Sequence, residues 1–277
     1  AKLDLQPLIE RWRSGEKSPT SLERPFAVRA DLATMTAASG IEWRGVKAEL
    51  SGDGDRLQRA NATGTLAGGG ATRITVEPIA SGRKLQFTSG DAGRVFQTLG
   101  LISKARGGRL SLAAVTDDRG PETKSTGTLE VSDLRVMEAP LLARILSVGS
   151  FEGIGEMFRG DGMTFRRARV PFQWTAKQIR LTDARAIGAI GITGEGTIAM
   201  PNGELDLRGE VIPAYTLNSA LGKVPFLGEL ISGKGGGIFG ISYRVRGTRK
   251  EPDVSVNPLS ALAPSKLKEM FLTPFGM

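Results

Sequence analysis

Hydrophobic and polar residues alternate along most of the chain, most clearly in its last third. In residues 204–211 one phase is apolar or glycine and the other is charged, with Leu205, Leu207, Gly209 and Val211 alternating with Glu204, Asp206, Arg208 and Glu210. A later run has the same period and places Phe239, Ile241, Tyr243 and Val245 in phase. Side chains of a strand point alternately to the two faces of a sheet. The pattern therefore predicts a sheet with one apolar face and one solvated face.

Shorter runs of the same period precede these, each bounded by Gly, Asp, Ser or Pro. Their in-phase apolar pairs are Ile74 and Val76, Leu85 and Phe87, Leu110 and Leu112, and Leu129 and Val131. Serial runs separated by turn residues are typical of antiparallel strands. The predicted fold is mainly β: an elongated, curved, mostly antiparallel sheet, open as a groove or gutter, with a few short helices. Asn202-Gly203 predicts a hairpin of the type I′ class.

Two segments have helical instead of strand periodicity. Apolar residues from Val95 to Ile102 predict a short helix, and those from Leu141 to Phe158, after Pro140, predict a helical insertion near 138–160. Both are most simply interpreted as plugs at the end or side of the sheet. We divide the chain into an N-terminal leader segment, 1–25, and a single elongated β-groove domain, 26–277.

The composition argues against an enzyme. The 277 residues include no histidine and no cysteine, which removes the commonest general base, the commonest metal ligand and any thiolate nucleophile. The segment from Gly228 to Gly235 approaches a phosphate-binding loop, but Gly235 replaces the Ser or Thr that would hold magnesium. Paired aspartates such as Asp117 and Asp118 lie beside turn residues, where Asp is favoured for backbone reasons. We expect no catalytic residue, no metal and no cofactor.

The net charge of +8 suggests nucleic acid or an anionic membrane as a partner. One dense cluster, Arg166, Arg167 and Arg169, lacks the aromatic neighbours on which bases stack, so a nucleic-acid partner is not expected. No uncharged run approaches the ~20 residues of a membrane-spanning helix. The chain begins at Ala1 without a signal peptide, and we expect it to be one piece of a longer protein.

The most specific sequence lies in the C-terminal third. Its segments are 211–215 (VIPAY), 217–219 (LNS), 224–228 (VPFLG), 241–245 (ISYRV) and 256–264 (VNPLSALAP), and upstream 91–93 (DAG), 107–110 (GGRL) and 139–144 (APLLAR). Their order resembles the C-terminal region of AsmA-like envelope proteins, the superfamily of AsmA, TamB and YhdP, and most closely its large alphaproteobacterial members. The resemblance extends from Phe26 to Phe271.

This resemblance implies an inner-membrane anchor followed by a long periplasmic β-groove that shields acyl chains. The expected function is a lipid-binding, periplasmic segment that contributes to phospholipid transport between inner and outer membrane and to outer-membrane integrity. Phospholipid acyl chains are the expected partners, with inner- or outer-membrane proteins as further partners. The alternative is a structural or assembly scaffold for envelope proteins that acts by strand-edge pairing.

The candidate lining residues are the in-phase apolar side chains of the predicted strands. They are Ile74, Val76, Leu85, Phe87, Leu110, Leu112, Leu129, Val131, Leu205, Leu207, Val211, Phe239, Ile241, Tyr243 and Val245. The same residues would form a closed core if the predicted helices packed against them. The pattern leaves both interpretations open.

Overall fold

The strands are built by the alternating segments of the sequence. The computed structural model describes residues 2–4, 25–36, 41–53, 56–120, 122–138, 140–148, 162–200, 202–213, 241–248 and 251–257. The strands are β1 (Lys2–Asp4), β2 (Phe26–Thr36), β3 (Glu42–Asp53), β4 (Arg56–Leu66), β5 (Ala71–Ile79), β6 (Gly82–Ser89), β7 (Lys104–Arg106), β8 (Arg109–Asp117), β9 (Lys124–Glu138), β10 (Met163–Trp174), β11 (Gln178–Gly188), β12 (Ile190–Ala199), β13 (Glu204–Pro213), β14 (Ile241–Thr248) and β15 (Pro252–Asn257). The helices are α2 (Ala92–Thr98) and α3 (Pro140–Val148).

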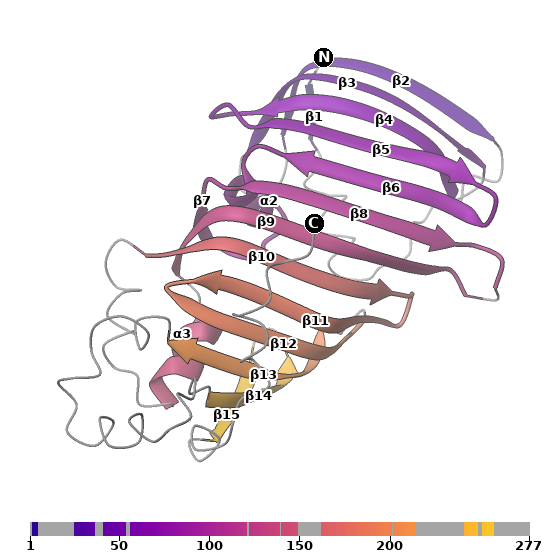
Figure 1. Cartoon of the computed structure of the whole chain (residues 1–277). Coiled ribbons are helices and arrows are strands. Elements are labelled where there is room, and N and C mark those ends of the chain that lie inside the picture. The colour runs from indigo at the N-terminus through magenta and orange to yellow at the C-terminus, as the bar shows by residue number, and fades with distance from the viewer. Residues whose placement is uncertain are drawn as a thin grey trace, which may run out of the picture.

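All of these strands belong to one curved, open sheet of 15 strands (Figure 1). Strands β2 to β15 follow one another in sequence order, each antiparallel to its neighbour, except that β6 pairs directly with β8 and β7 pairs with β9 off this path. Strand β1 is parallel to β2 and lies within the segment predicted as a leader. The predicted mainly β, mostly antiparallel, open sheet is confirmed.

The first predicted helix is confirmed as α2. Asp91 caps its N-terminus, with the side-chain oxygen accepting a 3.0 Å hydrogen bond from the Arg94 backbone N–H. Helix α3 covers the first part of the predicted helical insertion, and the part from 149 to 161 lies outside the described residues. Within the described part of the chain, neither helix is long enough to span a membrane.

The predicted Asn202-Gly203 hairpin exists, but its type I′ turn is wrong. Strand β12 ends at Ala199 and β13 begins at Glu204, so the connection has more than two residues. The Gly203 backbone N–H donates to the Ala199 carbonyl at 3.0 Å, and Gly203 has φ +70°. The left-handed glycine that suggested a type I′ turn instead closes a longer loop.

Candidate functional site

The hydrogen-bonding register aligns apolar residues into one continuous row that crosses the sheet. Residues paired directly across neighbouring strands share a face. Following the pairs from β2 to β15, the row consists of Val28, Leu50, Ala60, Val76, Leu85, Ala114, Gly127, Phe172, Leu181, Gly196, Leu207, Val245 and Val254. We call it row A. Every member is apolar or glycine.

Two shorter apolar rows lie on the same face and to one side of row A, row B two residues along the strands from it and row C two residues beyond row B. Row B consists of Ala30, Ala48, Ala62, Ile74, Phe87, Leu112, Leu129 and Val170. Row C consists of Leu110, Val131, Ala168, Ala186, Ile192, Val211 and Ile241. The three rows form a strip along one face of the sheet, and we call this whole face the apolar face.

The opposite face is polar along the same path. One row of it consists of Lys47, Thr63, Arg73, Thr88, Ser111, Glu130, Arg169, Arg185 and Thr193. Exposed ion pairs join neighbouring strands there, including Arg208 to Glu195 at 2.7 Å and Arg244 to Asp206 at 2.9 Å. Such pairs contribute about 0–1 kcal/mol each and mainly keep this face solvated. The strong asymmetry between faces makes the apolar face the candidate functional site.

The structure brings the predicted lining residues together on this face, except Phe239, which lies outside the described residues. Seven are buried: Val76, Leu110, Val131, Leu205, Val211, Ile241 and Val245. The other seven are partly exposed: Ile74, Leu85, Phe87, Leu112, Leu129, Leu207 and Tyr243. The half-exposed residues are concentrated in rows A and B of β5 to β9, so apolar surface remains accessible there.

Of the described residues, helices α2 and α3 cover only part of the apolar face. Val95 and Phe96 of α2 and Ile145 of α3 belong to the same buried cluster as Leu110 and Val131. Helix α3 also reaches the edge strand, where the Arg144 side chain donates to the Pro252 carbonyl of β15 at 2.8 Å. Figure 1 shows both helices behind the strands that face the viewer. The prediction that helices plug the side of the sheet therefore holds for α2 and α3, while β6, β8 and β9 keep half-exposed apolar residues.

Tyr243 bridges glycines on the apolar face. Its hydroxyl donates to the Thr193 carbonyl on β12 at 2.6 Å, passing over Gly209, its direct partner on β13. An aromatic ring over a strand glycine replaces the missing side-chain packing. Burial raises the pKa of Tyr243 to about 12, because the phenolate would be poorly solvated.

This shift predicts an alkaline loss of stability that Tyr243→Phe should remove. Between pH ~10 and ~12 the unfolded chain ionises its tyrosine while the folded one does not, so stability falls by about 1.4 kcal/mol per pH unit from this residue. Below pH ~10 the group is neutral in both states and contributes nothing to the pH dependence. Urea unfolding at pH 9, 10 and 11 should show a shallower decline for Tyr243→Phe than for the unsubstituted chain. Equal declines would contradict the assignment.

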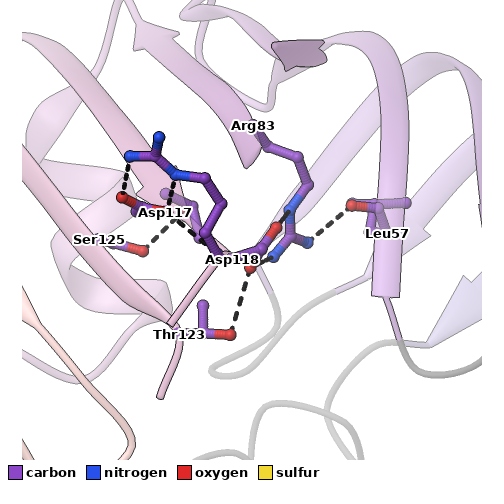
Figure 2. A network of polar contacts seen from close by, with 8 residues as sticks. Leu57, Arg83, Asp117, Asp118, Thr123 and Ser125 are labelled. Atoms are coloured by element: carbon purple, nitrogen blue, oxygen red, sulfur yellow. Dashed lines mark hydrogen bonds and ion pairs between the residues drawn. The ribbon is translucent and has the colours of Figure 1, made fainter. Parts of the chain in front are cut away.

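A polar network interrupts the apolar face at one end of the strands (Figure 2). Arg83 is in phase with Leu85, yet its guanidinium donates two 3.0 Å hydrogen bonds to Asp118 and one of 2.8 Å to the Leu57 carbonyl. The pair is mostly buried, with side chains 17% and 16% exposed. Thr123 also donates to Asp118, at 3.2 Å. The network ties three hairpin ends together and leaves Asp118 satisfied, as a buried carboxylate requires.

The neighbouring Asp117 shows why the paired aspartates are turn residues. Its carboxylate accepts hydrogen bonds from the side chain and backbone N–H of Arg119, which lower the pKa of Asp117 to about 2. Thr116 and Ser125 share a 2.9 Å hydrogen bond beside it. Asp117 is thus occupied by a local partner, as the turn interpretation predicted, whereas Asp118 pairs with Arg83 from another hairpin. No three potential metal ligands converge anywhere in the described ranges.

Sequence reasoning missed the smaller members of the apolar rows and the polar break. Ala60, Ala114 and Gly127 carry weak hydrophobic signals, so only the strand register identifies them as parts of row A. Arg83 was detectable, because it breaks the apolar phase of β6. The phosphate-loop-like segment at Gly228–Gly235 lies outside the described residues.

The chain was compared with protein-family models, curated proteins and solved structures, and none matches it.

Proposed function

We propose that this chain is a lipid-binding segment of a periplasmic β-groove, in which the apolar face holds phospholipid acyl chains and contributes to their transport between inner and outer membrane. The observation that carries this proposal is row A, an apolar line with one residue from every strand of β2 to β15 apart from β7. The resemblance to AsmA-like proteins supports it from the sequence. In this proposal the complete protein maintains outer-membrane integrity.

The dimensions of the apolar face suit this role. At ~4.8 Å between strands, row A extends on the order of 60 Å. One acyl chain spans half of a ~30 Å hydrocarbon core, about 15 Å, so several could lie along the row. Each buried CH₂ contributes ~0.8 kcal/mol without directional contacts. A lining without charged residues would therefore hold chains tightly enough to shield them and let them slide.

Arg83 lies on the apolar face, but in this proposal it plays no part in binding lipid headgroups. Arg83 uses its donors on Asp118 and the Leu57 carbonyl, so it closes one end of the strands instead. The rim of Pro78, Arg83, Thr116 and Ser125 marks where the apolar strip stops along β5 to β9. Acyl chains would lie on rows A, B and C, beside this rim.

The test uses the tryptophans of the apolar face as reporters of bound acyl chains. Trp43 pairs with Leu66, and Trp174, 37% exposed, pairs with Ile179. In a Trp12→Phe background, phospholipid brominated along its acyl chains should quench the remaining fluorescence, and mass spectrometry of the purified chain should find phospholipid. A folded chain that shows neither quenching nor bound lipid would reject the proposal and favour the strand-edge scaffold.

A further inference from the structure

A group of arginines gathers on the polar face where β9 ends and β10 begins. Strand β7 pairs with β9 at this place, as Figure 1 shows at the left edge of the sheet. The group consists of Arg106 on β7, Arg109 on β8, Arg135 on β9, and Arg166 and Arg167 on β10, and all five side chains are exposed. We call it the arginine patch.

The strand register brings these residues together from distant parts of the sequence. Arg106 lies directly opposite Arg135, and in the next row Arg109 and Arg167 flank Ser132. Asp133, with φ +56°, and Arg166 lie between the two rows, where the chain bulges. Beneath the patch, Leu134 and Phe165 are buried on the apolar face, so the arginines point away from the candidate lipid site.

The patch carries much more positive than negative charge. Its one acid is Asp133, which accepts a 3.0 Å hydrogen bond from Arg109. No described residue forms an ion pair with Arg106, Arg135 or Arg166. Like charges directly opposite on neighbouring strands are unfavourable. A surface built this way is complementary to an array of anions, and guanidinium groups bind phosphates with paired hydrogen bonds.

An exposed apolar residue lies in the loop that connects helix α2 to strand β7, which carries Arg106 of the patch. Helix α2 ends at Thr98, Gly100 follows with φ +59°, and the next residue, Leu101, is 48% exposed. Leu101 is five residues before Arg106, within about 18 Å along the chain. Cations beside an exposed apolar side chain are typical of surfaces that bind anionic membranes. The patch contains no aromatic residue on which nucleic-acid bases could stack.

We propose that the arginine patch, together with Leu101, docks the sheet on an anionic phospholipid membrane surface. This contact is separate from the binding of acyl chains, because it uses the opposite face of the sheet. It would hold the protein beside a lipid source while the apolar face remains free.

The test is flotation with vesicles of phosphatidylcholine alone or of equimolar phosphatidylcholine and phosphatidylglycerol. The unsubstituted chain should bind the anionic vesicles preferentially, and rising salt should weaken this binding. Each cation near an anionic leaflet strengthens binding about fivefold, so Arg106→Gln/Arg135→Gln/Arg166→Gln should reduce the preference about a hundredfold. Leu101→Ser should weaken vesicle binding by about tenfold more.

Matched variants separate the patch from net charge. Arg59→Gln/Arg73→Gln/Arg180→Gln removes the same charge from exposed positions of the polar face and should retain the preference. Asp133→Asn removes the acid of the patch, and asparagine also tolerates φ > 0. This substitution should increase binding to anionic vesicles about fivefold. Salt should abolish this gain if it is electrostatic, whereas binding through apolar surface exposed by misfolding would persist, so a salt-sensitive gain supports the proposal even if the triple variant is unstable.

Three results would overturn the proposal. Equal losses of anionic-vesicle binding in the patch and control variants would show that binding depends on the net charge of the chain and not on the arginine patch. Unchanged vesicle binding by Leu101→Ser, with loss of single-stranded DNA binding in the patch variant, would indicate a nucleic-acid surface. Absence of any anionic preference would exclude a membrane contact. Failure of acyl-chain capture is distinguishable, because it appears as absent quenching by brominated lipid while anionic flotation persists.

Discussion

Introducing two carboxylates on the apolar face, Leu85→Asp with Leu112→Asp, should reduce co-purifying phospholipid by at least about tenfold, since even 1.4 kcal/mol of lost binding gives that factor. Both residues are half-exposed and lie in the central strands β6 and β8, in rows A and B. An acyl chain on this strip would desolvate the new carboxylates, which costs several kcal/mol when no partner is present. The measurement is mass spectrometry of extracted lipid per mole of purified chain.

The control for this variant places the same charges one residue further along the same strands. Gln86→Asp with Ala113→Asp puts both carboxylates on the exposed polar face, where Gln86 and Ala113 are direct partners. This pair should leave lipid binding unchanged and cost about 1 kcal/mol of stability, because the two carboxylates lie directly opposite each other on neighbouring strands. Circular dichroism should show a folded sheet in both variants. Retained lipid in a folded Leu85→Asp/Leu112→Asp chain would eliminate the apolar face as the binding site.

The alternation in the sequence was sufficient to predict the sheet and its two faces. The phases of Leu205 and Leu207, or of Leu85 and Phe87, depend only on the two-residue period of a strand, which is local. Helix α2 was predictable for the same reason, because Val95 and Phe96 recur at helical spacing. These features need no knowledge of which strands are neighbours.

Row A itself could not be predicted, because it depends on register. A bulge changes the register, and several occur here: the pairing shifts between Leu181 and Ala184 and between Phe165 and Arg167. A bulge inserts one residue and shifts the phase of the alternation, but the weakly hydrophobic Ala184 and Ala186 after Leu181 make this shift difficult to recognise in the sequence. Gly127 and Gly196 were equally invisible, because a glycine carries no side chain to show a phase. The pairing of β6 with β8 could not be predicted either, because α2 and β7 lie between them in the sequence and the pairing depends on tertiary structure.

The arginine patch illustrates the same limit. The adjacent Arg166 and Arg167 were evident as a cationic cluster in the sequence. Arg106 and Arg135 became part of it only because the short strand β7 pairs with the end of β9. Charge patterning along a chain identifies local clusters, while a surface patch depends on strand order.

In the described part of the chain, one sheet and two short helices form the packing around the apolar face, and close packing between strands contributes to its stability. Tyr243 and the glycines beneath it are the clearest case. A β-carbon on Gly209 would meet the Thr193 backbone carbonyl and the Tyr243 hydroxyl, the latter at 2.7 Å. A backbone atom cannot move aside without breaking the ladder between β12 and β13. The close approach of this strand therefore requires glycine.

Gly209→Ala should consequently destabilise the chain by about 3 kcal/mol or more, the range of overpacked sites with no room to relax. Its control is Gly194→Ala, on the neighbouring strand beneath the same tyrosine. There the added β-carbon would lie 3.4 Å from the Tyr243 hydroxyl and 3.8 Å from the Ala184 β-carbon, and no backbone atom is close. Urea unfolding should show a loss below about 1 kcal/mol for Gly194→Ala. Similar losses for the two would contradict a close contact under Tyr243. Loss for Gly209→Ala alone would show that the close approach of the Thr193 backbone and the Tyr243 hydroxyl to β13 requires glycine at this position.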